Sequence, residues 1–374
     1  MNRVDQIRPD APGLGRFGAH AIGVRTLKFT HVSQPVITGP AEPVTVGDRT
    51  LTVELWYPAA RGTPPGGTYS TLIRDGQTRV TLMGRASRNA PHGKGPYPLV
   101  LMSHGYPGNR YLMAPLAEVI ASHGFVVASI DHEGSTYADQ LAIASTLYHR
   151  PLDQKFVLDR LSAGGWSLDG AIDASRVGVI GYSMGGYGAL VFGGAEVTKA
   201  AVTSEHAPPD GLLARHAKGS ALRSELTDDR LAAVIAIGPY GRGAGLLDAK
   251  GLAPMTRPLL VIAGDCDDIS GYASMRSIWT DSGARDKHLL TFLNAGHNAA
   301  APMPAPAESY AMSAKLGWPP FEHYADPVWD TVRMNNIAAH ACVAMLDAHL
   351  RDGPPAAERL AELSPLPGIA VETA

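Results

Sequence analysis

The sequence predicts an α/β protein in which a mostly parallel sheet carries helices on both faces. Short apolar runs of strand length alternate with segments of helical periodicity, and most of these runs are apolar throughout. Strands that are apolar throughout are buried on both faces, which is typical of parallel sheets. Of the 374 residues, 45% are hydrophobic and 18% are charged, so the chain can bury a large core.

The first clear strand is 51–57, which alternates apolar and polar residues with period two and stops at Pro58. This pattern predicts a strand near a sheet edge. Residues 59–98 are rich in Gly, Pro, Thr and Arg and are expected to be irregular. The other predicted strands are 98–102, 125–130, 176–180, 231–237, 258–263 and 288–293. Helices are expected at 111–123, 150–163, from Tyr187 to Gly193, and at 325–350.

The chain divides into three expected regions. Residues 1–50 form an N-terminal extension with the first strand, 51–350 form the main domain, and 351–374, rich in Pro and Ala, form a loose tail. Segments 204–228 and 298–326 have no clear strand pattern. They are interpreted either as insertions that cover a functional site or as ordinary surface loops.

Composition and charge exclude several classes of partner. The formal net charge is −3, with acids and bases spread along the chain, so neither nucleic acid nor an anionic membrane is an expected partner. No apolar run approaches the roughly 20 residues that span a bilayer. Residues 1–20 have no apolar signal region, which predicts a cytoplasmic location unless a secretory signal has been removed. The oligomeric state is not indicated.

The motif Gly-Tyr-Ser-Met-Gly-Gly at 181–186 follows a predicted strand directly. It indicates either a flexible glycine turn or a nucleophilic serine on a tight strand-to-helix turn. In the second case Ser183 has its Oγ exposed, and small residues flank it because the backbone is crowded. The amide of Met184 then heads a helix and is aimed at the position of an oxyanion.

Other chemically active side chains follow neighbouring strands. Asp265, Asp267 and Asp268 come after 258–263, and His297 comes after 288–293. Because the carboxyl ends of parallel strands meet at one edge, we expect an acid, His297 and Ser183 to converge there. His297 would take the serine proton, and an aspartate would orient the imidazole. Four other histidines follow the acids, namely His288, His323, His340 and His349; of these, His288 begins a strand, at the opposite edge, and His340 and His349 lie on the last helix.

The chain resembles the α/β-hydrolase superfamily over roughly 51–350. The segments Val-Glu-Leu-Trp-Tyr-Pro-Ala, Leu-Met-Ser-His-Gly-Tyr-Pro-Gly, Ile-Asp-His-Glu-Gly-Ser-Thr and Gly-Tyr-Ser-Met-Gly-Gly are similar to those of the dienelactone-hydrolase-related esterases. That branch is also similar to platelet-activating-factor acetylhydrolases and cutinase-like polyester hydrolases. The resemblance implies an eight-stranded, mostly parallel sheet and ester hydrolysis without a cofactor. It also implies Asp267 as the acid and the amide of Tyr106 as the second oxyanion donor. Dienelactone hydrolases use a cysteine nucleophile, so Ser183 favours a general carboxylesterase.

The expected function is therefore hydrolysis of a small-molecule carboxylic ester by Ser183, His297 and Asp267 through an acyl-enzyme, with no cofactor and no metal. The same residues could instead cleave lactones, amides or polyesters, and a catalytically silent binding protein could share the fold. A metal hydrolase built on the aspartate cluster is a third possibility, although no histidine lies close to it in sequence.

Three further groups have a structural and a functional interpretation. Residues 131–133, Asp-His-Glu, are expected to form a hydrogen-bonded loop at a strand end, and Glu205-His206 to belong to the insertion; either could contact substrate. Cys266 is expected to be a small buried filler and Cys342 a core residue. With only these two cysteines, a disulfide framework is excluded, and a zinc site built from cysteines is not expected.

Overall fold

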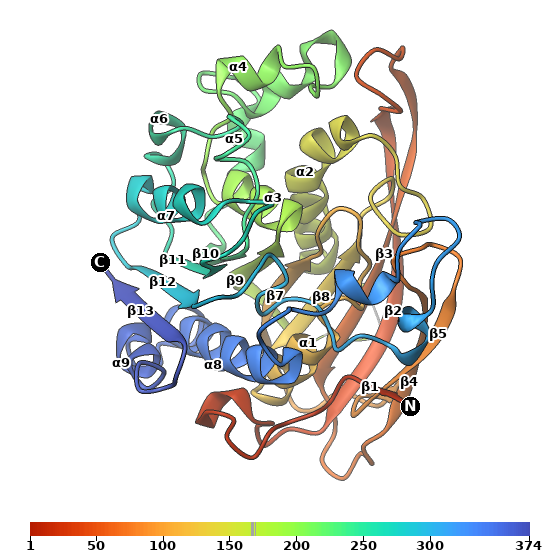
Figure 1. Cartoon of the computed structure of the whole chain (residues 1–374), viewed down its shortest axis with the longest axis vertical. Coiled ribbons are helices and arrows are strands. Elements are labelled where there is room, and N and C mark those ends of the chain that lie inside the picture. Colours follow the sequence, from red (N-terminus) through yellow and green to blue (C-terminus); the bar gives the residue numbers. More distant parts are fainter. Residues whose placement is uncertain (166–167, 169) are drawn as a thin grey trace.

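The computed structural model describes residues 1–165, 168 and 170–374. Among these residues, ten strands form one large sheet and three more form a small one (Figure 1). The order in the large sheet is β13-β12-β11-β10-β9-β7-β8-β3-β2-β6. From β12 to β8 neighbouring strands run parallel, whereas β3 and β13 run antiparallel to their neighbours. This sheet is wider than the eight strands that the resemblance implies.

The strands of the large sheet are β2 (Ile22–Val36), β3 (Thr45–Pro58), β6 (Ser87–Arg88), β7 (Tyr97–Ser103), β8 (Val126–Asp131), β9 (Ile172–Tyr182), β10 (Leu231–Ile237), β11 (Leu259–Gly264), β12 (Lys287–Phe292) and β13 (Ile369–Thr373). The small sheet consists of β1 (Asn2–Arg3), β5 (Arg79–Gly84) and β4 (Gly67–Leu72). The stretch 59–98 is therefore not irregular throughout, because β4 and β5 pair antiparallel within it.

Helices cover both faces of the large sheet (Figure 1). One face carries α1 (Ala114–Ser122), α8 (Thr331–Leu350) and α9 (Ala356–Ala361). The other face carries α2 (Ile143–Ser162), α3 (Met184–Phe192), α6 (Ala249–Leu252) and α7 (Tyr272–Asp281). Shorter helical segments lie at α4 (Lys199–Val202), α5 (Arg223–Leu226), η1 (Gly13–Gly15), η2 (Pro209–His216), η3 (Ala307–Tyr310) and η4 (Pro320–His323).

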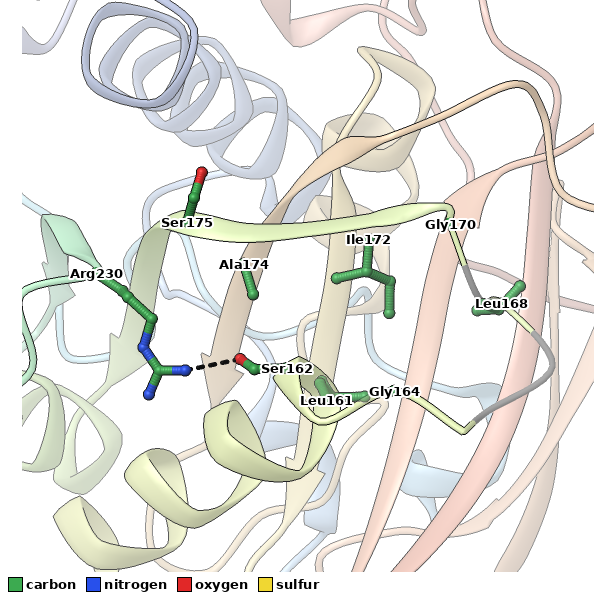
Figure 2. Close-up of a pocket in the computed structure, with 9 residues that line it drawn as sticks. All are labelled: Leu161, Ser162, Gly164, Leu168, Gly170, Ile172, Ala174, Ser175 and Arg230. Carbon is green, nitrogen blue, oxygen red and sulfur yellow. Dashed lines mark hydrogen bonds between the residues drawn. The ribbon is translucent and has the colours of Figure 1, made fainter.

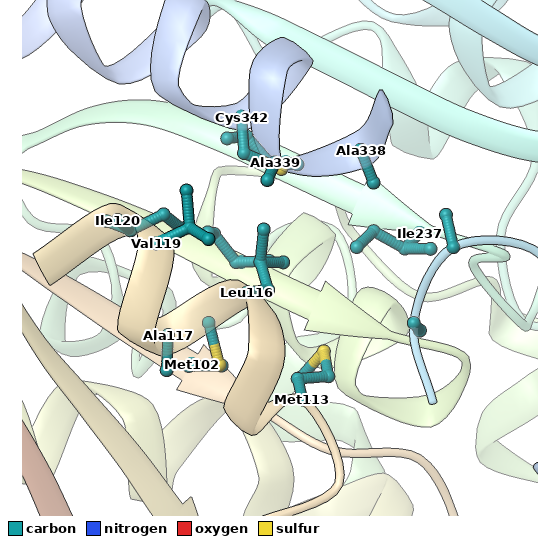
Figure 3. Packing of buried hydrophobic residues seen from close by; sticks show 14 of the residues in the cluster. Met102, Met113, Leu116, Ala117, Val119, Ile120, Ile237, Ala338, Ala339 and Cys342 are labelled. Atoms are coloured by element: carbon teal, nitrogen blue, oxygen red, sulfur yellow. The ribbon is translucent and has the colours of Figure 1, made fainter. Parts of the chain in front are cut away.

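The strands that the sequence shows as continuously apolar divide their side chains between two cores. In β7, Val100 and Met102 pack toward α1 and α8, whereas Leu99 and Leu101 pack on the opposite face. Figure 3 shows the first core, in which Met102 lies beneath α1 and Ala338 and Ala339 of α8 approach from the other side. Successive side chains of a strand point to opposite faces of the sheet. Because both faces of β7 are buried, every position from Leu99 to Met102 is apolar.

Helix α8 begins six residues later than the predicted start at 325. Asp330 is its N-cap and accepts a hydrogen bond from the amide of Arg333 at 2.8 Å. Just upstream, the carboxylate of Asp326 accepts from the amides of Val328 and Trp329. These local hydrogen bonds stabilise a turn at the expense of helix, so the apolar periodicity alone overestimates the helix length.

Residues 351–374 are not the loose tail that we expected. Helix α9 buries Leu360, Leu363 lies fully buried beyond it, and β13 then pairs antiparallel with β12. The tail covers an edge of the sheet that would otherwise expose unpaired backbone groups. Because β2 also joins the sheet from within 1–50, the sheet-containing domain extends on both sides of the predicted 51–350.

No helix within the described part of the chain is both long enough and apolar enough to cross a membrane.

Candidate active site

Ser183 occupies the turn between β9 and α3. Its φ is 55° and its ψ is −115°, a strained conformation for a residue with a side chain. The turn is held from both sides, because the Ser183 amide donates to the carbonyl of Ile237 at 2.8 Å and the Tyr187 amide donates to the Ser183 carbonyl at 3.0 Å. The side chain is placed at the rim of the sheet, and the residue is 8% exposed.

The glycines on either side of Ser183 are required by crowding. A Cβ on Gly181 would lie 2.1 Å from the carbonyl oxygen of Gly185, and a Cβ on Gly185 would lie 2.0 Å from that of Ser103. Real Cβ atoms do not approach backbone oxygens so closely. The glycine spacing of the motif is therefore explained by the tight approach of α3 to the ends of β9 and β7.

The structure brings Ser183, His297 and Asp267 into one hydrogen-bonded chain. Nε2 of His297 lies 3.0 Å from Oγ of Ser183, and Nδ1 lies 2.8 Å from Oδ2 of Asp267. The three residues follow β9, β12 and β11, respectively, at the same edge of the sheet. An ionised carboxylate can only accept, so Nδ1 carries the proton and Nε2 is free to accept one from the serine.

The three neighbouring aspartates occupy different environments. Asp267 is buried, and its Oδ1 accepts from the amides of Ile269 and Ser270 at 2.9 and 2.8 Å. Burial acts to raise the pKa of Asp267, but the bond to His297 and these amides outweigh it and hold the pKa below its ordinary value. Asp265 accepts from the amide of Asn294, and Asp268 is exposed toward the cleft. Of the three, Asp267 is the one bonded to His297.

Two backbone amides flank Ser183. Met184 is the first residue of α3, and the first N–H groups of a helix have no acceptor within it. Tyr106 follows β7 on the opposite side, where a Cβ on the preceding Gly105 would stand 3.4 Å from Cβ of Ser183. Among the described residues, no acceptor takes a hydrogen bond from the Tyr106 amide. Both N–H groups are therefore available to a ligand atom near Oγ of Ser183.

A cleft of about 790 Å³ opens over Ser183 and His297. One wall comes from the loop after β7, including Tyr106, and another from the end of the segment 298–326, including Trp318 and His323. Asn298 ties the histidine loop to this wall by donating to the carbonyls of Glu322 and Ala325 at 2.9 and 2.7 Å. Of the described residues that line the cleft, none comes from 204–228. Of the two predicted insertions, 298–326 is therefore the one that contributes described residues to the cleft wall.

Other predicted groups lie away from this chemistry or differ from expectation. Cys266 is exposed and borders the cleft instead of filling the core, whereas Cys342 is buried as expected. Glu205 and His206 are exposed, with their side chains 3.7 Å apart. In the described part of the chain, no group of three or more His, Cys, Asp or Glu side chains is arranged to hold a metal ion.

A second hollow, of about 390 Å³, lies at the far end of β9 (Figure 2). Arg230 points along it and donates to Oγ of Ser162 at 2.8 Å. The guanidinium is also paired with Asp159 and Asp228. These partners take the hydrogen bonds of Arg230, and the described lining contains no histidine or carboxylate. This hollow therefore has no set of side chains comparable to that around Ser183.

Sequence reasoning missed a buried polar network below the loop 103–106. His132 bonds to Oγ of Ser103 through Nε2 and to Asp153 through Nδ1, both at 2.8 Å. Arg49 donates two hydrogen bonds to the same carboxylate, at 2.8 and 2.7 Å. These residues lie in β3, in β7, in α2 and just after β8, so no local motif could have joined them. Residues 131–133 form a hydrogen-bonded loop at the end of β8, in which His132 belongs to the buried network and the two acids accept from backbone amides. None of the three lines the cleft.

Part of the chain matches a known family. Residues 90–210 match the PET hydrolase-like family model. This chain is similar to that family. The matched residues include Ser183 and Tyr106 but end before Asp267 and His297.

Curated relatives match a segment of similar length. Cutinase est1 of Thermobifida alba is 40% identical over 100 residues, which cover 27% of this chain and 31% of that protein. Cutinase cut1 of Thermobifida fusca is also 40% identical over 100 residues, covering 27% and 29%, respectively. The chain thus spans about a third of the length of the cutinases that it matches.

The whole fold matches a solved structure, a ferulic acid esterase from Streptomyces cinnamoneus. The TM-score is 0.63 at 20% identity, covering 100% of this chain and 99% of the other. At this identity the likeness shows the fold. The predicted α/β-hydrolase fold is confirmed.

Proposed function

We propose that this protein is a serine hydrolase that cleaves carboxylic esters through an acyl-enzyme intermediate. The observation that carries the proposal is the hydrogen-bonded chain from Ser183 through His297 to Asp267, beside the amides of Met184 and Tyr106. The cutinase and PET hydrolase-like similarities support the same class of reaction. Ester hydrolysis by this arrangement needs no cofactor, in line with what the resemblance to α/β-hydrolases implies.

In the first half-reaction, His297 Nε2 accepts the proton of Ser183 Oγ as the oxygen attacks the ester carbonyl. The carbonyl oxygen becomes an oxyanion and accepts hydrogen bonds from the amides of Met184 and Tyr106. Asp267 accepts from Nδ1–H and stabilises the imidazolium. The imidazolium then returns the proton to the departing alkoxide, which leaves as an alcohol.

In the second half-reaction, water attacks the acyl group on Ser183 while His297 Nε2 accepts one of its protons. The same two amides hold the second oxyanion. Collapse of that intermediate returns the proton from His297 to Ser183 Oγ and releases the carboxylic acid. The cycle therefore consumes one ester and one water and restores the free enzyme.

The substrate is an ester that fits an open cleft of about 790 Å³. A small-molecule ester is the first candidate. A polyester is the second, because the family model that matches residues 90–210 is PET hydrolase-like. The cytoplasmic location expected from residues 1–20 receives no support from the cutinase relatives and stays a prediction from sequence.

The deciding experiment compares the protein with its Ser183→Ala variant. We expect the wild type to hydrolyse p-nitrophenyl butyrate and to be labelled by a fluorophosphonate probe. We expect the variant to remain folded, to escape labelling and to lose about 10⁶-fold in kcat, as other serine hydrolases do when the nucleophile is removed. Near-normal turnover in the variant would overturn the assignment, and an unlabelled, inactive wild type would favour a silent binding protein.

A further inference from the structure

Arg150 lies in α2, directly beneath the loop that carries Tyr106. It is 1% exposed, and its guanidinium donates to the carbonyl oxygens of His104 and Gly105, the second at 3.3 Å. It also donates to Oγ of Ser135. In the described part of the chain, the atoms that accept hydrogen bonds from this guanidinium are therefore neutral oxygens, and no carboxylate lies within ion-pair distance of it.

The hydrogen bond from Arg150 to the Gly105 carbonyl helps to fix the direction of the neighbouring N–H. The Gly105 carbonyl and the Tyr106 amide belong to one peptide group, which is trans. In a planar trans peptide the C=O and N–H bonds point in opposite directions. Nδ1 of the buried His104 lies 2.7 Å from the same carbonyl oxygen. Because Arg150 and His104 together hold the carbonyl on the buried side of the loop, the Tyr106 N–H points away from the core, on the side where Ser183 lies.

Arg150 also contacts the element that carries the other amide. Its Cγ lies so close to α3 that a Cβ on Gly188 would stand 2.5 Å from it. One turn further along α2, Nε2 of Gln154 donates to the carbonyl of Gly185 at 3.4 Å. The same stretch of α2 therefore touches both the loop that ends at Tyr106 and the helix that begins at Met184.

The buried charge of Arg150 is costly for the fold. Burial lowers the pKa of Arg150 to about 9, although the nearby Asp153 acts in the opposite direction, so the group is a cation at neutral pH. Asp153 does not offset the cost by contact, because Arg49 and His132 occupy its oxygens. An uncompensated buried cation is expensive unless another charge appears nearby.

We propose that Arg150 is a positioning residue for the oxyanion hole, aiming and polarising the Gly105–Tyr106 peptide so that its N–H stabilises the transition state. This inference rests on the proposed ester hydrolysis at Ser183. A guanidinium on the carbonyl of a peptide withdraws electron density and makes its N–H a stronger donor. The cation also lies beneath the loop whose amide faces the developing oxyanion. The negative charge of the oxyanion therefore offsets part of the cost of burying the guanidinium, and it does so only in the transition state.

The test compares Arg150→Met and Arg150→Lys with Arg223→Lys as the matched control. Arg223 is a partly buried arginine that, like Arg150, donates to a backbone carbonyl, but its acceptor is Val191 at 3.1 Å, at the end of α3 opposite to Ser183. Each variant is assayed with p-nitrophenyl butyrate, and its affinity is measured for butylboronic acid, which adds to a serine Oγ as a tetrahedral anion, and for the product butyrate.

We expect Arg150→Met to lower kcat by roughly 10- to 100-fold with KM within about twofold, because only the transition state uses the aimed N–H. Arg150→Lys keeps the positive charge but lacks the planar guanidinium that donates to several acceptors at once. Its decrease in kcat should therefore be smaller than that of Arg150→Met. Boronate affinity should fall in step with kcat while butyrate affinity stays constant, and Arg223→Lys should behave like the wild type.

Unchanged kcat in the folded Arg150 variants would overturn the proposal. A parallel loss of boronate and butyrate affinity would also overturn it, because that pattern reports a loosened site. If Arg150→Met does not fold, the kcat of Arg150→Lys and its affinities for boronate and butyrate test the proposal in the same way. A wild type whose turnover does not depend on Ser183 would defeat the proposed function itself, whereas normal Ser183-dependent turnover with indifferent Arg150 variants would defeat only this inference.

Discussion

Gly185 packs against the carbonyl oxygen of Ser103 so closely that a Cβ would stand 2.0 Å from that oxygen. This contact sets the distance between α3, which begins just after Ser183, and the end of β7, which leads to Tyr106. The two amides that flank Ser183 are therefore held at a fixed spacing by direct backbone contact, in addition to the side-chain contacts that α2 makes with both elements.

Replacing Gly185 should disturb this spacing. We expect Gly185→Ala to lower kcat for p-nitrophenyl butyrate by about 10²-fold or more, because α3 and the Tyr106 loop must separate and one oxyanion contact is lost. Gly13→Ala is the control, since a Cβ on Gly13 meets no atom within 4 Å. A Gly185→Ala variant with wild-type kcat would show that the close contact is not needed for turnover.

The acid that orients His297 can be identified by substitution. We expect Asp267→Asn to keep the fold and to lower kcat by about 10³- to 10⁴-fold, since an amide can donate to Nδ1 and favour the wrong tautomer. Asp268→Asn should cost far less, because Asp267 makes the bond to Nδ1. Circular dichroism and kcat of both variants check this, and a larger loss in Asp268→Asn would reverse the assignment.

Buried histidines should make the fold sensitive to mild acid. His216 is fully buried with Nε2 on the carbonyl of Tyr148 at 2.8 Å, and its Nδ1 has no partner among the described residues. Burial lowers the pKa of His216 to about 4, well below the usual value near 6.5. The unfolded chain therefore binds this proton first, and stability present above about pH 6.5 is lost as the pH falls toward 4.

The slope of this loss is measurable. We expect His216→Gln, which can keep the hydrogen bond to Tyr148, to reduce the fall in unfolding free energy between pH 6.5 and 5 by up to roughly 1.4 kcal/mol per pH unit. Urea unfolding at pH 7, 6 and 5 gives the comparison, with the exposed His206→Gln as control. Identical slopes for wild type and His216→Gln would contradict the prediction.

The C-terminal segment should contribute to stability. Leu360 on α9 is fully buried in the core, where α9 packs against α8 and β13. We expect Leu360→Ala to lower the free energy of unfolding by about 2–4 kcal/mol because it leaves a cavity. Leu222→Ala, at a residue that is 42% exposed, should change it by no more than about 0.5 kcal/mol. Equal effects of the two substitutions would show that α9 is not coupled to the core.

The sequence alone determined the alternation of strands and helices in the parallel part of the sheet and the edge at which Ser183 and His297 would lie. Continuous apolar runs identify strands buried on both faces, and a serine among glycines directly after such a run identifies the turn at Ser183. His297 could be placed in the same way, because parallel strands end at a common edge. These inferences need only local pattern and one rule of topology.

Only the tertiary structure decided which partners meet across the chain. Three adjacent aspartates have nearly the same local pattern, and the direction of each side chain distinguishes Asp267 from its neighbours. The contacts of Arg150 with the Tyr106 loop, the pairing of β13 with β12, and the absence of 204–228 from the described cleft walls all join residues far apart in sequence. Such contacts depend on packing between elements, which periodicity and spacing do not encode.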